Sequence, residues 1–230
     1  GLGTIQPSQS DYFQATKGGA HGDFHLIVLA PNSVQEMHDF VFDAFDLAFK
    51  YRNPVMILSD GVIGQMMEKV VLADQRPRRT AEEIIAQDGD WALTGKTADR
   101  KEHVITSLEL DPYAQERFNE KLIAKYAKIR ENEVRYEEFM TEDADYIIVA
   151  FGSAARICRM TVEMAREAGY KVGLVRPITL YPFPSKVLHD LAARGVKGFL
   201  SAELNHGQMV EDVRLAVNGQ APVEHYGRSG

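Results

Sequence analysis

Short runs of consecutive apolar residues recur along the chain and predict buried strands. A continuous apolar run of four to eight residues, bounded by turn signals, is typical of a strand that is covered on both faces, as in parallel sheets. The runs lie at residues 26–30, 55–59, 146–150, 172–175 and 198–202.

Between these runs, apolar residues recur at the three- and four-residue spacing of amphipathic helices. Over residues 34–51 this spacing is sustained, and Ser33 followed by Glu36 predicts a capping box at the helix start. Strands that alternate with helices predict right-handed βαβ units, and for the later part of the chain a doubly wound parallel sheet. The other helices of these units are expected from about residue 153 and over residues 182–194 and 208–217.

The middle of the chain interrupts the α/β pattern. Residues 73–112 are charged and irregular, without sustained periodicity, and residues 115–140 predict one charged helix. We therefore expect three segments, which are an α/β domain, a connector with a helix, and a second α/β domain. Their predicted bounds are residues 1–72, 73–140 and 141–230.

Composition narrows the class of partner. The chain has 230 residues, 45% of them hydrophobic, and a formal net charge of -7 without any basic run. An acidic chain of this kind argues against nucleic acid or an anionic membrane as its main partner. It has no stretch of about 18 apolar residues and no signal peptide pattern at its start, so the cytoplasm is the expected location.

The single cysteine, Cys158, excludes an internal disulfide. It cannot hold an iron–sulfur cluster, which needs about four thiolates. Any cluster is therefore expected on another chain. The sequence starts without methionine at Gly1 and stops at Gly230, and we expect it to be a piece of a longer protein.

Polar residues follow two of the predicted strands, where ligands collect in open parallel sheets. Asp60 and Gly61 come directly after residues 55–59 and predict either a site or interface, or a plain turn. Glu203, Asn205 and His206 follow residues 198–202. Their carboxylate, amide and imidazole groups suit a ligand or a partner subunit, but a polar loop with Asn205 as a helix cap explains them equally well.

Two further motifs have plainer interpretations. Gly152-Ser153 resembles the start of a phosphate-binding turn, yet a strand-to-helix turn with Ser153 as N-cap is favoured. In the helix that follows, the apolar residues at helical spacing are expected to face inward, and they include Ile157, Met160 and Met164. The second motif, Asp88-Gly89-Asp90, lacks the further oxygen ligands of a metal loop and is interpreted as a surface turn.

The densest group of polar side chains lies at residues 3–11 and 17–23. Glycines there allow a close backbone approach, and hydroxyl, amide and imidazole groups suit a carboxylate or a polar cofactor ring. Taken as chemistry alone, the pattern favours a disordered or merely connecting loop over a binding site.

The same region carries a family resemblance. The run GLGTIQPSQSDYFQAT at residues 1–16, with HGD at residues 21–23 and IVLAP at residues 27–31, resembles the α subunit of 2-oxoacid:ferredoxin oxidoreductases. The branched-chain, 2-oxoisovalerate type is the most similar. DGVIGQ at residues 60–65, Arg176-Pro177 and residues 203–205 look like the same subunit.

The resemblance implies part of a pyrimidine-type domain that binds thiamine diphosphate, followed by a transketolase C-terminal-like domain. It also implies a β subunit that binds the diphosphate and Mg²⁺, an iron–sulfur subunit, ferredoxin as acceptor, and coenzyme A as a substrate. The polar groups of the first run would face the substrate or cofactor, and Asp60, Gly61, Glu203, Asn205 and His206 would lie at an interface. The residues facing the substrate or cofactor would be Thr4, Gln6, Ser8, Gln9, His21 and Asp23.

Several features of the family are missing from this sequence. The glutamate that activates the cofactor and an Arg-Gly-Gly-Pro run should lie upstream of Gly1, and the Gly-Asp-Gly metal motif is absent. We therefore expect the isolated chain to be inactive in oxidative decarboxylation. Two rivals remain: a transketolase-like or lipoamide-linked 2-oxoacid dehydrogenase subunit, and a non-catalytic assembly module.

Overall fold

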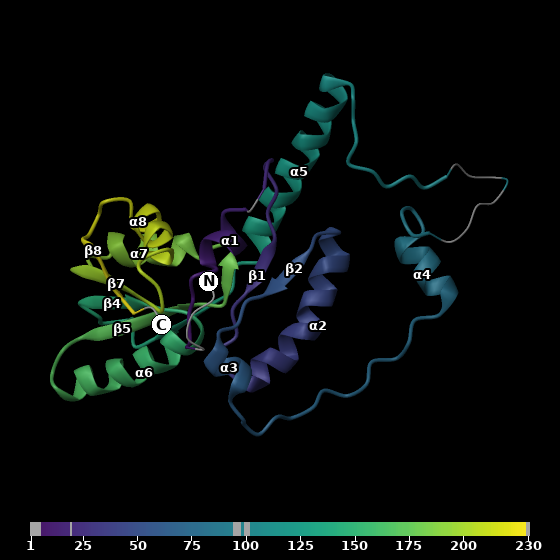
Figure 1. Ribbon diagram of the computed structural model, residues 1–230. Coiled ribbons are helices and arrows are strands. Elements are labelled where there is room, and N and C mark those ends of the chain that lie inside the picture. The colour runs from purple at the N-terminus through teal and green to yellow at the C-terminus, as the bar shows by residue number, and fades with distance from the viewer. Residues whose placement is uncertain (1–5, 19, 94–97, 99–101, 229–230) are drawn as a thin grey trace. The chain divides into compact units, whose positions relative to one another are not determined.

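The apolar runs form the strands of two sheets (Figure 1). A computed structural model describes residues 6–18, 20–93, 98 and 102–228. The chain divides into two compact units, one made of Gly1–Val71 with Glu120–Gly230 and the other of Leu72–Asn119. In the part of the chain that is described, no helix is long and apolar enough to cross a membrane.

The first sheet has the strand order β2-β1-β6. Its central strand β1 (Ile27–Leu29) is fully buried and runs parallel to β2 (Val55–Ile57). The helix between them, α2 (Val34–Tyr51), covers the sheet through Phe40 and Leu47. This is the predicted βαβ unit.

The third strand of this sheet, β6 (Thr179–Tyr181), comes from the later part of the sequence. It pairs with β1 in the antiparallel direction, so that Val28 lies opposite Tyr181. The sequence analysis did not predict this strand. The segments at residues 1–71 and 120–230 therefore share a sheet. The predicted division of this chain into segments at residues 1–72, 73–140 and 141–230 remains a prediction.

The second sheet has the order β3-β5-β4-β7-β8. Its central strand β4 (Tyr146–Val149) runs parallel to β5 (Val172–Pro177) and β7 (Gly198–Glu203). The edge strand β8 (Val223–Gly227) is parallel to β7, whereas β3 (Tyr136–Phe139) is antiparallel to β5. Strands β3 and β8 were not predicted.

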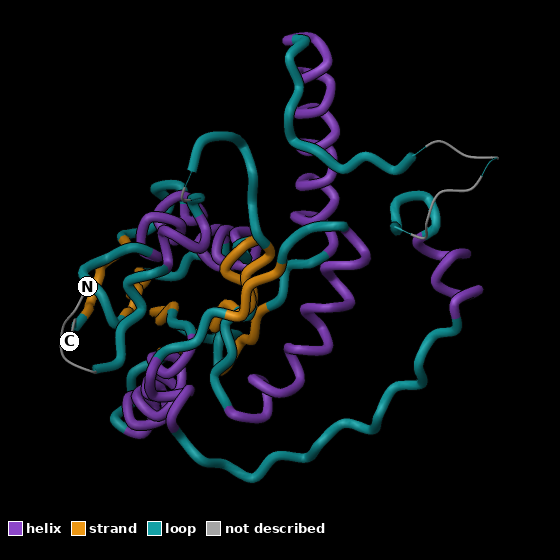
Figure 2. Tube along the Cα trace, turned by 45° about the vertical axis from the view of Figure 1, so that its right-hand side comes forward, coloured by secondary structure: helices purple, strands orange, loops and turns teal. Residues whose placement is uncertain are grey.

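Helices cover both faces of the second sheet, because alternate side chains of β4 point to opposite faces. Ile147 and Val149 pack with α7 (Ser185–Ala193) and α8 (Met209–Val217). Ile148 packs with α6 (Gly152–Glu167) on the other face (Figure 1). Figure 2 shows the strands lying between helices. The predicted doubly wound α/β class is confirmed.

The predicted inward face of α6 is wrong. Ile157, Met160 and Met164 are each more than 60% exposed. The buried face carries small residues instead, with Ala154, Ala155, Cys158 and Val162 packed against the sheet. Small side chains let the helix axis approach the sheet closely, so helical spacing alone selected the wrong stripe.

The prediction of one helix over residues 115–140 is also wrong. Helix α5 (Pro112–Asn132) ends early, and residues 136–139 form the edge strand β3. Three of the four side chains of β3 are exposed, so it carries neither an apolar run nor a clear alternation. Tyr126 and Ile129 near the end of α5 pack against the first sheet.

Capping also differs from the prediction. Ser33 does cap α2 by accepting the N–H of Glu36, but the Glu36 carboxylate bonds Asn32 and Arg176 instead of closing a capping box. A complete box of Thr80 and Glu83 starts α4 (Ala81–Asp88) in the segment predicted to be irregular. Two short helices, α1 (Tyr12–Thr16) and α3 (Gly61–Gln65), complete the structure as described.

Candidate functional site

Asp60 lies at the carboxyl end of β2 and joins the starts of two helices. One carboxylate oxygen caps α3 by accepting the N–H groups of Val62 and Ile63. The other accepts the N–H of Ser153 at 3.1 Å and its hydroxyl at 2.6 Å. The N-terminus of α6, which resembled a phosphate-binding turn in the sequence, is therefore filled by a carboxylate of the protein itself.

The predicted role of Ser153 as an N-cap is wrong, because Phe151 occupies the cap position without a side-chain bond. Ser153 lies one residue inside the helix and its hydroxyl donates to Asp60. A carboxylate at a helix N-terminus interacts favourably with the free N–H groups and the helix dipole. Asp60 is 7% exposed, so this contact is shielded from water.

Gly152 allows this close approach. Its φ of +56° lies in the left-handed region, and an added Cβ would lie 3.0 Å from the Gln9 Nε2 and 3.2 Å from the Asp60 Oδ2. Both neighbours are buried polar groups with fixed partners, so neither can move away without losing hydrogen bonds.

We therefore expect Gly152→Ala to lower the free energy of unfolding by about 2–3 kcal/mol, of which about 1–2 kcal/mol is the left-handed backbone. Gly169→Ala is the matched control, because Gly169 also has a positive φ (+89°) but nothing within 4 Å of an added Cβ. Urea unfolding of both variants separates the backbone cost from the crowding. Equal losses in the two variants would contradict the crowding.

Gln9 anchors the first described residues to the second sheet. Its backbone N–H donates to the Leu204 carbonyl at 2.9 Å, and its side-chain oxygen accepts the Leu204 N–H at 3.1 Å. Its Nε2 donates to the Phe151 carbonyl at 2.9 Å, and its own carbonyl accepts from the Asn205 side chain at 3.0 Å. The structure thus brings together Gln9 and Asn205, which the sequence analysis had assigned to different roles.

Glu203 is buried at the end of β7 and caps α8. Its carboxylate accepts the N–H groups of Gln208, Met209 and Val210 and the hydroxyl of Ser201. Its side chain is 0% exposed. The helix cap that one of the two interpretations gave to Asn205 is therefore provided by Glu203, while the Asn205 side chain accepts only the Gly207 N–H within its own loop.

The predicted site residues fall into three groups. Ser8, Gln9 and Asp60 line a small crevice at the carboxyl ends of β2 and β4, together with Asp11, Leu58, Ser59, Phe151 and Gly152. Glu203 and Asn205 are buried beside it, whereas Gly61 and His206 are exposed. Gln6, His21 and Asp23 are exposed and do not line the crevice, and Thr4 lies outside the described residues.

The crevice offers polar and apolar groups but no metal site. The Ser8 hydroxyl bonds the Ser10 hydroxyl at 2.9 Å, and Leu58 provides an apolar wall. Among the described residues, no group of three or more His, Cys, Asp and Glu side chains is placed to hold a metal ion. The crevice has a volume of only about 20 Å³, so it can admit no more than the edge of a polar ring, and its groups do not suit a diphosphate with its cation.

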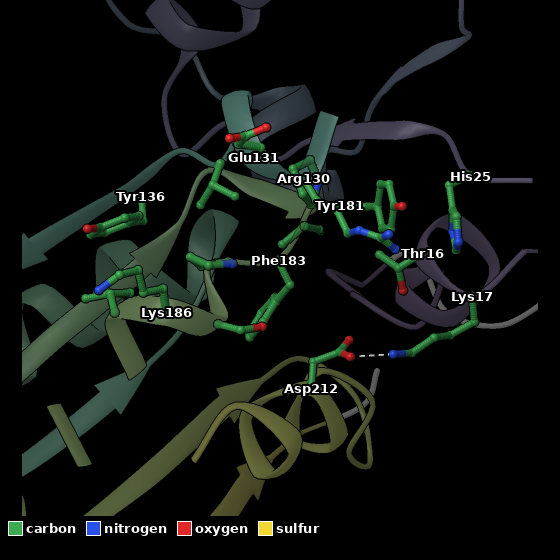
Figure 3. Close-up of a pocket in the computed structure, with 16 residues that line it drawn as sticks. Thr16, Lys17, His25, Arg130, Glu131, Tyr136, Tyr181, Phe183, Lys186 and Asp212 are labelled. Carbon is green, nitrogen blue, oxygen red and sulfur yellow. Dashed lines mark hydrogen bonds and ion pairs between the residues drawn. The ribbon is translucent and has the colours of Figure 1, made fainter. Parts of the chain in front are cut away.

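A larger cavity of about 750 Å³ was missed by the sequence analysis (Figure 3). It lies between the end of α1, the end of α5 and the turn from β6 to α7. The Tyr181 ring stacks on His25 with 4.2 Å between ring centroids. The run Tyr181-Pro182-Phe183-Pro184, a rigid aromatic turn between a strand and a helix, is the sequence signal that marks it.

The single cysteine has a thiol of low reactivity. Cys158 is 8% exposed, and burial raises the pKa of its thiol to about 11. Because the thiolate is the reactive form, we expect Cys158 to react with a thiol reagent at pH 8 at least about tenfold more slowly in the native chain than in urea. The time course of labelling measures this. Equal rates in the native and unfolded chain would contradict it.

Comparisons with known proteins match both parts of the chain. Residues 3–138 match the family model described as pyruvate flavodoxin/ferredoxin oxidoreductase, thiamine diphosphate-binding. Residues 144–230 match pyruvate:ferredoxin oxidoreductase core domain II. A solved 2-oxoglutarate:ferredoxin oxidoreductase from Magnetococcus marinus has the same fold, with a TM-score of 0.73 and 22% identity over 98% of this chain and 43% of that one.

Fold and family models together define an α/β protein of the thiamine-diphosphate-binding class. The chain belongs to the pyruvate flavodoxin/ferredoxin oxidoreductase family, which confirms the resemblance found in the sequence. The ketoisovalerate oxidoreductase subunit VorB of Methanothermobacter marburgensis is 50% identical over the whole of this chain. The 2-oxoglutarate synthase subunit KorA of the same organism is 32% identical over 94% of it. The chain spans 63% of the VorB relative and 62% of the KorA relative.

Proposed function

We propose that the full-length protein is a subunit of a 2-oxoacid:ferredoxin oxidoreductase that acts on 2-oxoisovalerate. The observation that carries this proposal is the 50% identity to a ketoisovalerate oxidoreductase subunit over all 230 residues. The 2-oxoglutarate synthase subunit is less similar, with 32% identity. In this reaction a 2-oxoacid is decarboxylated, its acyl group passes to coenzyme A, and two electrons pass to ferredoxin.

Thiamine diphosphate is the proposed cofactor, and when bound it supplies the carbanion and the electron sink that decarboxylation needs. The crevice residues are suited to the polar ring of the cofactor rather than to its diphosphate. Ser8 offers an exposed hydroxyl there, and Gln9 holds the run that carries Ser8 against the second sheet. We assign Gln9 a positioning role, and we keep Gln6, Ser8, His21 and Asp23 as the residues that face substrate or cofactor.

The rest of the machinery is proposed to lie on other chains or in parts of the protein that these 230 residues do not span. Mg²⁺ and the diphosphate are proposed to belong to a β subunit and the iron–sulfur clusters to a further subunit, and the single cysteine of these 230 residues cannot hold a cluster within them. Gly61 and His206 are exposed at the ends of β2 and β7 and are the predicted interface residues still accessible to a partner. We place the complex in the cytoplasm.

Activity assays on the assembled protein test the proposal. The full-length protein, produced together with its partner subunits, is expected to reduce ferredoxin only when 2-oxoisovalerate and coenzyme A are both present. We expect kcat/KM for 2-oxoisovalerate to exceed that for 2-oxoglutarate by at least about tenfold, which corresponds to about 1.4 kcal/mol of transition-state discrimination. The 230-residue chain alone is expected to be inactive.

Four results would contradict the proposal. Preference for 2-oxoglutarate would assign another substrate, and transfer to a lipoyl protein instead of ferredoxin would favour a 2-oxoacid dehydrogenase. If the partner subunits keep the same activity and cofactor affinity when this subunit is omitted, this subunit is a non-catalytic assembly module. Ferredoxin reduction by the isolated chain would show that this chain needs no partner subunit for the reaction.

A further inference from the structure

The cavity beside His25 is built from segments that are far apart in the sequence. Thr16 and Lys17 at the end of α1 form one wall, and Arg130 near the end of α5 forms another. The turn between β6 and α7 closes it with Pro182, Phe183 and Pro184. It lies at the amino end of β1, whereas the crevice of Ser8 and Asp60 lies at the carboxyl ends of β2 and β4.

The walls are mostly apolar. Aromatic and aliphatic side chains surround the space, and a volume of about 750 Å³ is within the range of sites for small organic molecules. Such a surface favours the apolar body of a ligand over a bare inorganic ion. The apolar wall consists of Val134, Leu180, Tyr181, Pro182, Phe183, Pro184 and Val187.

The charges of the lining leave one cation without a carboxylate partner. Lys17 forms an ion pair with Asp212, and Lys186 forms one with Asp190 on its own helix. Within the described part of the chain, Arg130 has no such carboxylate. Figure 3 shows its guanidinium group directed toward Tyr181 and Thr16, while the Glu131 carboxylate points away from them.

Two polar atoms in the same wall have no hydrogen bond of full geometry among the described residues, although Arg130 lies close enough to Tyr181, and the Thr16 backbone to His25, to affect the pKa values of these two side chains. They are the His25 Nδ1 and the Tyr181 hydroxyl oxygen, and both are buried from water. Burial lowers the pKa of His25, and the charge of Arg130 lowers it further, so the imidazole is neutral near pH 7.

We propose that this cavity binds a small organic oxyanion, with its charged group on Arg130 and its apolar body against Tyr181 and Phe183. Arg130 offers a planar fork of donors that matches a carboxylate or a phosphate ester. The ligand class is therefore a monocarboxylate or phosphomonoester with an aromatic or branched aliphatic body.

Calorimetric titration of the full-length protein in its complex tests the proposal with four probes. Benzoate and phenyl phosphate carry both the charge and the body, benzyl alcohol has the body alone, and inorganic phosphate has the charge alone. We expect at least one of the two aryl anions to bind at least about tenfold more tightly than benzyl alcohol and inorganic phosphate, since a charge-assisted hydrogen bond is stronger than one between neutral groups. Comparing benzoate with phenyl phosphate distinguishes a carboxylate from a phosphate ester.

Variants tie the binding to the cavity. Arg130→Gln is expected to weaken the preferred aryl anion at least about tenfold and to leave benzyl alcohol unchanged, whereas Arg130→Lys restores part of the loss. Lys128→Gln is the matched control, because it removes one exposed charge from the same helix outside the cavity lining. Phe183→Ala is expected to weaken both the aryl anion and benzyl alcohol.

Each other outcome overturns the proposal. No saturable binding of either aryl anion would leave the cavity without a ligand of this class. Equal affinity for both aryl anions and benzyl alcohol would show that the charge of Arg130 contributes nothing to binding. Equal losses in Arg130→Gln and Lys128→Gln would place the binding outside the cavity. The test reads binding alone, so it is independent of the proposed oxidoreductase activity.

Discussion

Replacing Arg176 by methionine is expected to lower the free energy of unfolding by about 3 kcal/mol. The Arg176 side chain is 2% exposed and lies on β5. It donates to both oxygens of Glu36 on α2, to Glu137 on β3 at 3.0 Å, and to the Ala30 carbonyl after β1 at 3.1 Å. Loss of the guanidinium leaves two carboxylates and a buried carbonyl without their donor.

The expected loss is at the lower end of the range for buried ion pairs, because Glu137 is half exposed and regains water. Arg176→Lys is expected to lose less than Arg176→Met, since it keeps the charge but not the fork of donors. Arg214→Met is the control, an exposed arginine whose loss should change stability by less than about 0.5 kcal/mol. Urea unfolding measures all three, and a loss below about 1 kcal/mol in Arg176→Met would refute the buried network.

Replacing Glu203 by alanine is expected to cost about 3 kcal/mol of unfolding free energy. The carboxylate accepts three backbone N–H groups at the start of α8, and Met209 and Val210 are buried there. Without it, water cannot reach two of these N–H groups to replace the lost bonds. Each buried donor left without a partner costs about 1–3 kcal/mol.

Glu211→Ala is the matched control on the same helix. Glu211 is also an acidic residue in the first turn of α8, but it is exposed, so only its small favourable effect on the helix dipole is lost, about 0.3–1 kcal/mol. Denaturant unfolding followed by circular dichroism compares the two variants. If both variants lose the same unfolding free energy, the buried cap by Glu203 stabilises the protein no more than an exposed acidic residue in the same turn.

The sequence was sufficient where side-chain burial follows a simple period. The runs at residues 26–30 and 146–150 contain β1 and β4, which lie at the centres of their sheets and are covered on both faces. The edge strands β3 and β8 escaped prediction because exposed residues interrupt them, three of four in β3 and two of five in β8, so neither is a continuous apolar run. The inward face of α6 was misassigned because small residues, and not the large apolar ones, pack on the sheet.

The candidate site was predictable only in part. The rule that ligands collect at carboxyl ends of strands pointed to Asp60 and to residues 203–208, and both do lie at those ends. Their partners could not be predicted. Asp60 bonds Ser153, 93 residues away, and Gln9 bonds Leu204, 195 residues away, so no local pattern signals either contact.

The sequence by itself determined the α/β class, the family and the positions of the central strands along the chain, because these depend on local periodicity and on motifs that are continuous in the chain. Only the tertiary structure decided what the polar residues do. It placed β6 beside β1, turned Asp60 and Glu203 into buried caps, and assembled Lys17, Arg130 and Tyr181 around one cavity. The physical reason is that a buried polar group takes whichever partner the packing brings within hydrogen-bond distance, and packing joins residues that the sequence keeps far apart.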